Sequence, residues 1–286
     1  ATTEIYTLSL HDALPIWGKD VGMEYREGNR GLRMKFDEDE INYDRWRPGY
    51  PDELFQAVAE YAGLERGMRA LEVGIGTGQA TRPFLEAGCR VTAVELGEKL
   101  AAYSQVKFQN FFNLEILQGD FIKCPLQGDS FDLLYSATAF HWIPEEQGYP
   151  KALRLLKSGG TLAVWWNHPC PAPEQPELFQ EIQKVYGRFG RAVRKSPVEF
   201  TEENCAPLAQ QLKEMGFSGV ESRLFHSSRS LGPEEYCGLL NTYADHRAME
   251  ENARAGFMEG ISSAIMRFGG RLELRDTMDL YLARKP

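Results

Sequence analysis

Short apolar runs alternate with amphipathic stretches through the first part of the sequence. Residues 70–73 and 90–95 have the apolar character of short buried strands. Residues 81–87, 98–107 and 144–156 have the composition and spacing of helices. Strands that alternate with helices indicate a parallel sheet with right-handed crossovers. The pattern therefore predicts an α/β fold.

A glycine-rich turn follows the first of these strands. Gly74, Gly76 and Gly78 leave out side chains where the backbone must turn sharply and approach a ligand closely. The helix after this turn would direct its N-terminal amides at that ligand. Glu95 ends the next strand, 21 positions after Gly74, and a carboxylate there can accept both hydroxyls of a ribose. Together these features predict a half-fold that binds a nucleoside.

The alternation ends after Asn167. The proline-punctuated residues 168–173 predict a semi-rigid linker in a polyproline II conformation. The remaining patterns predict helices at 177–189, 204–215, 233–243 and 249–268, and strands at 219–231 and 271–285. We expect the last strand to be broken near Asp276. Because ligands of open parallel sheets bind beyond the carboxyl ends of the strands, we expect the helices to form a cap over that edge.

The spacing Glu72-x-Gly74-x-Gly76-x-Gly78 resembles the first motif of class I S-adenosylmethionine-dependent methyltransferases. Later segments resemble that family's third strand, fourth strand and turn into the fifth strand, in the same order: 114–121, 130–136 and 155–164, with Ser158 where proline is usual. The resemblance covers residues 41–167. It implies S-adenosyl-L-methionine as the cofactor and a Rossmann-like, mostly parallel seven-stranded sheet with helices on both faces and a helical cap.

The sequence is expected to divide into three parts. Residues 34–167 are expected to form the S-adenosylmethionine-binding core, and residues 168–286 the helical cap insertions plus the last two strands. Residues 1–33 are expected to be a non-native or poorly packed extension, since residues 1–16 look like the conceptual translation of a sequencing-adapter oligonucleotide. Met34 or Met23 would then be the true start.

The resemblance assigns nine cofactor-binding positions in the core. The three glycines would admit the methionine and ribose portions, Asp120 would accept from the adenine amino group, and Phe121 would lie alongside the ring. Ser136 and Ala137, just after the fourth strand, would lie under the methionine chain of the cofactor through backbone contacts. The nine positions are Glu72, Gly74, Gly76, Gly78, Glu95, Asp120, Phe121, Ser136 and Ala137. A turn cap is the alternative role for Asp120.

Tyr43 and Arg47 resemble the N-terminal segment of small-molecule methyltransferases akin to trans-aconitate methyltransferase. In those enzymes an aromatic residue and an arginine approach the cofactor carboxylate, and an arginine fork suits a carboxylate geometrically. The resemblance therefore adds Tyr43 and Arg47 to the cofactor-binding residues. A surface ion pair of Arg47 with Asp44 or Asp52 is the alternative.

Candidate acceptor-facing residues come from two segments. His141 follows the fourth strand and is either a general base or a residue that positions its loop, because imidazole titrates near neutral pH. Trp142 either walls the acceptor pocket or packs in the core. Tyr243 and His246 lie three positions apart on one helical face, so they either reach the acceptor or pack the cap. His141 and His246 are thus the catalytic candidates, and His141, Trp142 and Tyr243 the substrate-binding ones.

The net charge and the positions of the cysteines limit which partners, metals and compartments are expected. A net charge of −9 without a basic stripe argues against binding of a nucleic acid backbone. The five cysteines are scattered without metal-ligand spacing, which predicts reduced thiols, no metal site and no disulfides. No apolar run approaches the roughly 20 residues of a membrane helix. We expect a cytoplasmic protein that acts away from membranes, and the sequence leaves its oligomeric state open.

Methyl transfer from a sulfonium requires alignment and exclusion of water rather than a metal or a protein nucleophile. We therefore expect methyl transfer to a small-molecule acceptor, with a free carboxylate as the acceptor that the resemblance favours, because ester formation needs no base. An O-, N- or C-methylation that uses His141 or His246 stays open. A nucleotide-binding oxidoreductase and a non-catalytic cofactor-binding module are further alternatives, and the glycine spacing counts against the first.

Overall fold

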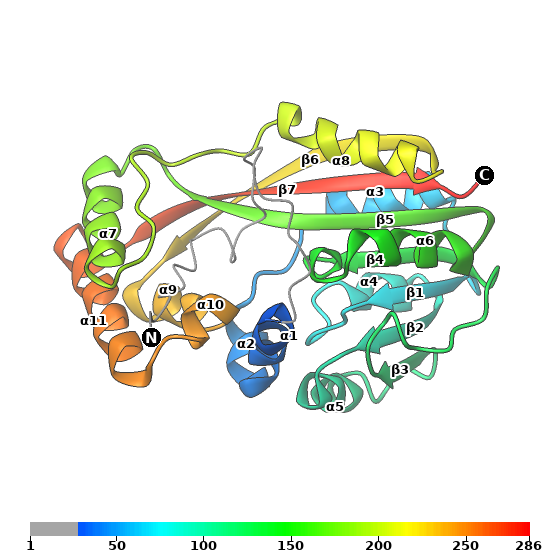
Figure 1. The fold of residues 1–286 in the computed structure, drawn as a ribbon, viewed down its shortest axis with the longest axis horizontal. Coiled ribbons are helices and arrows are strands. Elements are labelled where there is room, and N and C mark those ends of the chain that lie inside the picture. Colours follow the sequence, from blue (N-terminus) through cyan, green and yellow to red (C-terminus); the bar gives the residue numbers. More distant parts are fainter. Residues whose placement is uncertain (1–27) are drawn as a thin grey trace, which may run out of the picture. The chain divides into compact units, whose positions relative to one another are not determined.

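The computed structural model describes residues 28–286, with side chains from residue 31 onward (Figure 1). The expectation that residues 1–33 form a non-native or poorly packed extension concerns, for residues 1–27, a part of the chain outside the described residues. Within the described part, Gly28–Arg33 form the short helix α1, and Met34–Glu38 form the 3₁₀ helix η2. No helix among the described residues combines the length and apolarity needed to cross a bilayer.

The chain forms two compact units. One comprises residues 47–167, 201–225 and 278–286, and we call it the core unit. The other comprises residues 168–200 and 226–277 together with the described residues up to 46, and we call it the helical unit. Three long strands, β5 (Leu156–Pro171), β6 (Ser218–Leu231) and β7 (Leu272–Arg284), contribute residues to both units.

The strands form one seven-stranded sheet in the order β3-β2-β1-β4-β5-β7-β6. The first four are β1 (Arg69–Val73), β2 (Arg90–Glu95), β3 (Leu114–Gln118) and β4 (Phe131–Ala137). The pairs β1–β2, β2–β3, β1–β4 and β4–β5 are parallel. Strand β7 runs antiparallel to β5, since the Gly159 amide donates to the Lys285 carbonyl and the Ala172 amide to that of Glu273. The mostly parallel seven-stranded sheet predicted from the sequence is confirmed.

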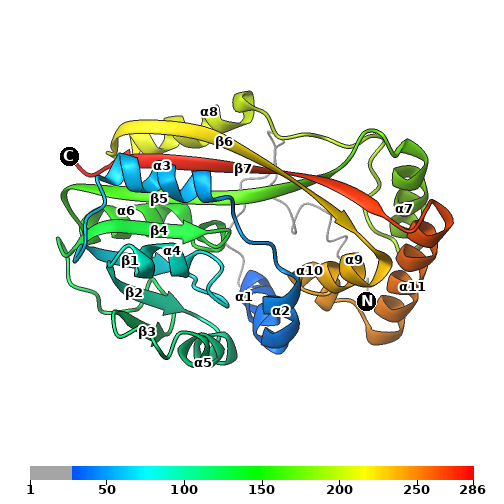
Figure 2. The same cartoon turned by 180° about the vertical axis from the view of Figure 1, so that it is seen from behind.

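Helices cover both faces of the sheet in the core unit. Figures 1 and 2 show α3 (Asp52–Ala62) and α4 (Thr81–Glu86) on one face, and α6 (Glu145–Leu155) and α8 (Glu202–Glu214) on the other. Helix α5 (Glu98–Lys107) connects β2 to β3, and the 3₁₀ helix η3 (Phe140–Trp142) follows β4. Helix α3 begins with two carboxylates that favour its positive N-terminal end, and it ends at Gly63 in the left-handed conformation.

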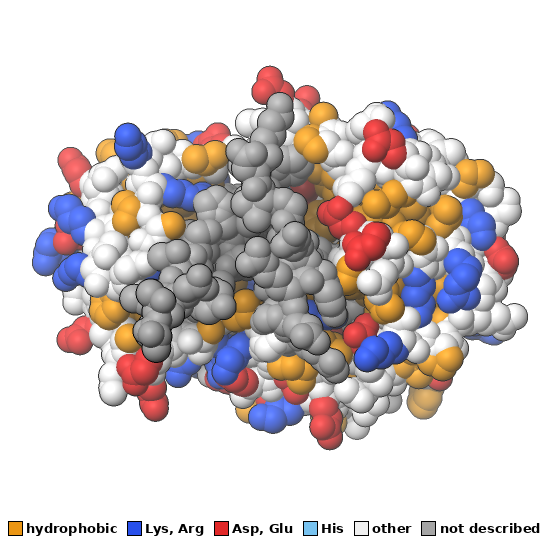
Figure 3. Space-filling model, in the orientation of Figure 1, with side chains coloured by type: hydrophobic (Ala, Val, Ile, Leu, Met, Phe, Trp, Pro, Cys, Tyr) orange, Lys and Arg blue, Asp and Glu red, His pale blue; other side chains and the backbone are white. Residues whose placement is uncertain are grey.

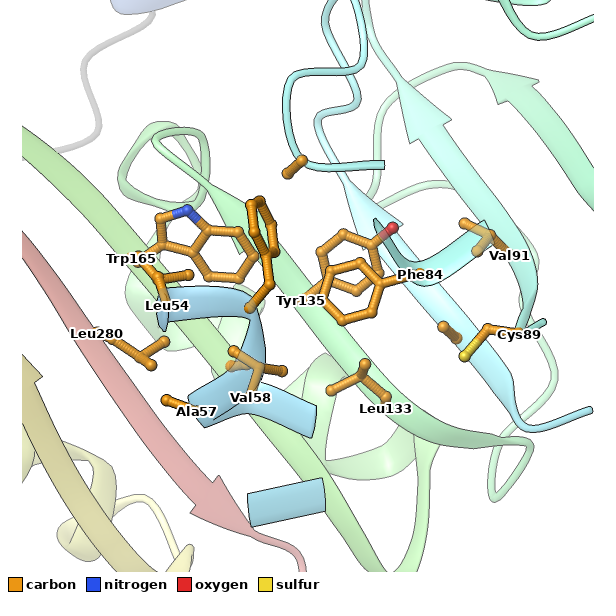
Figure 4. Packing of buried hydrophobic residues seen from close by; sticks show 14 of the residues in the cluster. Leu54, Ala57, Val58, Phe84, Cys89, Val91, Leu133, Tyr135, Trp165 and Leu280 are labelled. Carbon is orange, nitrogen blue, oxygen red and sulfur yellow. The ribbon is translucent and has the colours of Figure 1, made fainter. Parts of the chain in front are cut away.

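The main core lies between α3, α4 and the central strands (Figure 4). Leu54 and Val58 from α3 are fully buried against Leu133 of β4 and Leu280 of β7. The rings of Tyr135 and Trp165 stack in parallel, with centroids 6.0 Å apart. Strands buried on both faces explain the nearly continuous apolar runs that identified them in the sequence.

The proline-rich stretch 168–173 is not a linker, because β5 continues through Pro171. Strand β4 ends at Ala137, opposite Trp165, so beyond that point no described strand pairs with β5 on the β4 side. The amide of Ala172 bonds to β7. Backbone N–H groups along a strand point alternately to its two neighbours. Because the Ala172 N–H points to β7, the N–H positions of residues 169 and 171 point to the opposite edge, where β4 has already ended. The missing proline N–H groups therefore interrupt no ladder bond between strands of the described part, as is typical of prolines on strand edges.

The expected break near Asp276 is also wrong, because β7 is continuous from Leu272 to Arg284. The Asp276 carboxylate is buried, and the guanidinium of Arg229 on β6 binds it, with Nη2 2.7 Å from Oδ1. A buried, unpaired carboxylate would make a strand unfavourable at this position. Arg229, on the neighbouring strand, neutralises the charge of Asp276, so the strand continues.

The helical unit has its own core. Besides α1 and η2, its helices are α2 (Glu40–Trp46), α7 (Pro176–Arg188), α9 (Pro233–Leu240), α10 (Ala244–Arg247) and α11 (Glu251–Arg267). Leu178 and Ile182 of α7 are buried with Leu239 of α9 and with Phe257 and Ile261 of α11. Helices α2 and α9 approach so closely that a Cβ at Gly238 would lie 2.5 Å from the Trp46 ring.

Candidate cofactor and acceptor site

The turn after β1 has a backbone that only glycine tolerates well. Gly74, Gly76 and Gly78 have φ angles of 78°, 55° and 82°, all in the left-handed region. A Cβ at Gly74 would lie 2.5 Å from the Cβ of Ala139, and one at Gly78 would overlap the Phe108 ring. The three glycines predicted as cofactor-binding therefore shape a tightly packed loop at the carboxyl end of β1.

Glu95 is fixed beside this loop. The Gly76 amide donates to Glu95 Oε2 at 2.8 Å, and the Gly97 amide donates to Oε1 at 2.9 Å. The side chain is 7% exposed and ends β2, next to the glycine turn. Each carboxylate oxygen has more than one lone pair, so neither amide bond saturates the oxygen that accepts it. The arrangement suits a pair of ribose hydroxyls, and that role remains a prediction.

Glu72 lies under the glycine loop. Its Oε2 accepts from Thr81 Oγ1 at 2.8 Å and from the Tyr135 hydroxyl at 2.9 Å, and the side chain is 1% exposed. Burial raises the pKa of Glu72 to about 8, against the opposing effect of the two hydrogen bonds. Glu72 therefore joins β1 to α4 and β4, and these bonds favour support of the loop over direct contact with a ligand.

Helix α5 holds the carbonyl groups of the loop. Ser104 Oγ donates to the Gly76 carbonyl at 2.8 Å, and Lys107 Nζ donates to the Thr77 carbonyl at 2.8 Å. Sequence reasoning missed both residues. Their spacing of three positions places them on one face of the helix, which is the signal that could have found them.

The segment after β3 is braced by α6. Asp120 Oδ1 accepts from the Ile122 amide at 2.9 Å, so the carboxylate caps its own turn. Lys151 Nζ donates to the carbonyls of Ile122 at 2.9 Å and Cys124 at 2.7 Å, and lies 5.1 Å from the centroid of the Phe121 ring. Phe121 is buried, which favours packing over an open adenine platform. The adenine contacts of Asp120 and Phe121 remain predictions, and Lys151 was missed.

The end of β4 is held by three hydrogen bonds. Ser136 Oγ donates to the Val73 carbonyl at 2.7 Å, and the Thr138 amide donates to the Trp165 carbonyl at 2.7 Å. Thr138 has a φ of 52°, which is strained for a β-branched residue. Its hydroxyl lies 2.9 Å from that of Tyr50, which sequence reasoning did not single out. Ala137 lies between these anchored positions.

His141 and Trp142 follow in η3. The indole Nε1 of Trp166 donates to His141 Nδ1 at 2.7 Å. The His141 and Trp142 ring centroids are 5.2 Å apart, and both side chains are half-buried. The loop thus brings the two candidates together at the carboxyl end of β4, in the same unit as the glycine loop and Glu95.

The remaining candidates lie mainly in the helical unit. Tyr43, on α2, packs edge-on against Phe36 with centroids 6.2 Å apart. His246 is 1% exposed, with Nδ1 2.8 Å from Asp245 Oδ1 and Nε2 3.2 Å from the Tyr186 hydroxyl. Tyr243 packs beside it, with ring centroids 5.9 Å apart. Arg47 belongs to the core unit, and its Nε is buried.

The surroundings of His246 disfavour a catalytic proton transfer. Burial, reinforced by the positive charge of Arg191, lowers the pKa of His246 well below its usual range. Arg191 itself forms a buried ion pair with Asp245. Both ring nitrogens of His246 therefore have partners inside the helical unit, which favours the packing alternative.

The core unit fits an adenosyl sulfonium. It combines a tightly packed glycine turn at the end of β1, a fixed carboxylate at the end of β2, and an anchored loop at the end of β4. Residues 71–164 match a family defined as the methyltransferase domain. A methyltransferase-like protein of Schizosaccharomyces pombe is 26% identical over 210 residues, which cover 73% of this chain and 77% of that protein. The chain is a class I S-adenosylmethionine-dependent methyltransferase.

Two further comparisons extend these findings, the first in sequence and the second in fold alone. A methyltransferase of Mycobacterium tuberculosis is 30% identical to this methyltransferase over 166 residues, 58% of this chain and 64% of that protein. The solved structure of a Haemonchus contortus phosphoethanolamine N-methyltransferase, in complex with S-adenosylhomocysteine and phosphomonomethylethanolamine, has a TM-score of 0.52 and 17% identity. It covers 87% of this chain and 57% of that one. The methyltransferase uses S-adenosylmethionine, and the family match favours methyl transfer over the oxidoreductase alternative.

Hydrogen bonds connect several of the residues predicted to bind this cofactor. The glycine loop and Glu95 adjoin directly, and Ser136 bonds to the last residue of β1. Among residues 28–286, no group of three or more histidine, cysteine or acidic side chains has the arrangement of a metal site.

Proposed function

We propose that this methyltransferase transfers a methyl group to the carboxylate of a small molecule, forming a methyl ester. When bound, S-adenosylmethionine supplies an electrophilic methyl carbon on a sulfonium. The glycine loop and Glu95 would hold the cofactor, and the anchored segment 136–142 would align the acceptor behind that carbon. The observation that supports the cofactor part of this proposal is the hydrogen bond from the Gly76 amide to Glu95, which holds the glycine loop and the carboxylate together.

The charge distribution favours a small acceptor over a polyanion. The net charge is −9, and Figure 3 shows acidic and basic side chains interspersed on the described surface of this face. A nucleic acid would require a concentration of basic residues to neutralise its phosphates. The resemblance of Tyr43 and Arg47 to the trans-aconitate methyltransferase branch favours a carboxylate among small acceptors.

A labelled-methyl assay tests this proposal. The protein would be incubated with S-adenosylmethionine carrying a tritiated methyl group and with separate pools of carboxylic acids, amines and phenols. Mild alkali releases methanol from a methyl ester but leaves N-, C- and ether-linked methyl groups in place. We expect label from the carboxylic acid pool to become volatile after alkali. Label that stays non-volatile would contradict ester formation and would indicate one of the other methylations.

A further inference from the structure

The hydrogen bond between Trp166 and His141 determines where the histidine carries its proton. An indole N–H can only donate, so the 2.7 Å contact from Trp166 Nε1 requires a lone pair on His141 Nδ1. A neutral imidazole has one protonated nitrogen, and here that nitrogen must be Nε2. His141 therefore presents an N–H group, not a lone pair, at its second nitrogen.

Both partners of this bond are held in place. Trp166 lies on β5, is 5% exposed, and its backbone amide donates to Asp279 Oδ1 at 3.1 Å. Its ring packs edge-on against Tyr281, with centroids 5.9 Å apart. His141 follows the segment that Thr138 anchors through Tyr50 and the Trp165 carbonyl. Because β5 and β7 fix the indole, the imidazole cannot change its tautomer without losing the bond.

We propose that Trp166 is a positioning residue that holds His141 as a hydrogen-bond donor to the methyl acceptor, so that the enzyme takes acceptors whose nucleophilic atom is already unprotonated. The inference rests on the proposed function and deepens it. A general base needs a lone pair within reach of the proton that it removes. With Nδ1 bonded to Trp166 and Nε2 protonated, His141 offers none.

A carboxylate matches such a donor. Nε2–H would bind one carboxylate oxygen with a charge-assisted hydrogen bond and leave the other oxygen to attack. The attacking oxygen forms its bond to the methyl carbon with its own lone pair, while the methyl–sulfur bond breaks and its electron pair goes to sulfur. The negative and positive charges cancel, and no proton is released, so no base is needed.

Two substitutions of His141 distinguish a hydrogen-bond donor from a general base. His141→Gln places an amide nitrogen near the position of Nε2, so it keeps a donor but cannot remove a proton at neutral pH. His141→Asn keeps an acceptor for Trp166 near the position of Nδ1 and removes the donor. His141→Gln keeps the donor but loses the acceptor for Trp166, so we expect its kcat/KM to fall roughly three- to tenfold, as for a neutral hydrogen bond. His141→Asn should lose roughly 10- to 100-fold, the range for a charge-assisted hydrogen bond. Equal loss in both variants would overturn the donor role.

The tautomer itself is measurable without any acceptor or cofactor. Two-bond proton–nitrogen spectra of protein labelled with ¹⁵N-histidine would distinguish an unprotonated Nδ1 from an unprotonated Nε2. We expect wild-type His141 to carry its proton on Nε2, and Trp166→Phe to shift the ring toward the other tautomer. Trp165→Phe is the matched control, because the buried Trp165 Nε1 has no hydrogen-bond partner among the described residues. That variant should leave the His141 proton on Nε2, although loss of packing against Tyr50 can shift the signals of the loop.

The outcomes distinguish this inference from the proposed function. A proton on Nδ1 in the wild-type protein, or an unchanged tautomer in Trp166→Phe, would overturn the inference whatever the acceptor. An Nε2 proton that Trp166→Phe displaces would support it. Failure of the proposed function would instead appear in the alkali assay, as product label that does not become volatile.

Discussion

The hydroxyl oxygens of Tyr50 and Thr138 lie 2.9 Å apart, although the residues are 88 positions apart in the chain. Tyr50 precedes α3, and its ring packs edge-on against Trp165 with centroids 5.7 Å apart. Thr138 begins the segment that leads to His141 and has a strained left-handed backbone. Strain of this kind persists only when surrounding contacts impose it. The Tyr50 hydroxyl is therefore a contact that holds the acceptor loop in its conformation.

Loss of this hydroxyl pair should loosen the loop. We expect Tyr50→Phe to lower kcat/KM roughly three- to tenfold, since a neutral hydrogen bond contributes about 0.5–1.5 kcal/mol. Affinity for S-adenosylhomocysteine should change little, because the hydrogen bonds that fix Glu95 to Gly76 and Gly97 involve neither hydroxyl. Thr138→Val, which keeps the side-chain shape, should have the same effect. If the two effects add fully in the double variant, the hydroxyls do not act through each other.

Glu95 should control cofactor affinity. A glutamine at this position can accept from only one of the two amides, of Gly76 and Gly97, without placing its NH₂ group against the other. It also removes the charge that would bind ribose hydroxyls. We expect Glu95→Gln to weaken binding of S-adenosylhomocysteine tenfold or more, since such charge-assisted bonds contribute about 1.5–3 kcal/mol. Calorimetric titration measures this, with the exposed Glu98→Gln as the control. Equal affinities in the two variants would contradict the role.

Lys151 should stabilise the segment that carries Asp120 and Phe121. Lys151→Met removes the donor to the Ile122 and Cys124 carbonyls while keeping an aliphatic chain of similar length. We expect S-adenosylhomocysteine affinity to fall roughly three- to tenfold, less than the loss of a direct charge-assisted bond, because Lys151 acts on the cofactor only through this segment. Lys123→Met, on an exposed side chain of the same segment, provides the control. The account of this brace fails if both variants bind as wild type does.

Glu72 should make stability depend on pH. Its pKa is about 8 in the folded protein and near 4.5 when unfolded, so the folded state binds more protons between these values. The free energy of unfolding should therefore fall as pH rises from about 4.5 to 8, by roughly 1.4 kcal/mol for each unit of pKa shift. Glu72→Gln keeps the acceptor for Thr81 and Tyr135 without the titration. Urea unfolding at pH 5 and pH 8.5 should show the variant gaining on wild type at the higher pH. Parallel pH profiles would show that the carboxyl is not perturbed.

Local pattern was sufficient to predict the sheet and the cofactor loop. Apolar runs identified the buried strands, and the glycine spacing with Glu95 identified the two parts of the loop that the fold brings together. Each of those features depends on neighbours within a few positions or on an adjacent parallel strand. Periodicity and turn chemistry report such short-range constraints directly.

The sequence did not predict features that depend on distant partners. The continuity of β7 at Asp276 depends on Arg229, which lies 47 positions earlier on β6. The continuation of β5 past Pro169 depends on where β4 ends. The bond between Trp166 and His141, which decides between a base and a donor, joins two elements 25 positions apart. None of these partners can be found from the periodicity of a single segment.

The central claim is that the glycine loop and Glu95 form a site for an adenosyl sulfonium, and calorimetric titration of the wild-type protein tests it most directly. We expect S-adenosylhomocysteine to bind with measurable heat at one molar equivalent and NAD to give none under the same conditions. Heat with NAD but none with S-adenosylhomocysteine, or no heat with either ligand, would contradict the claim.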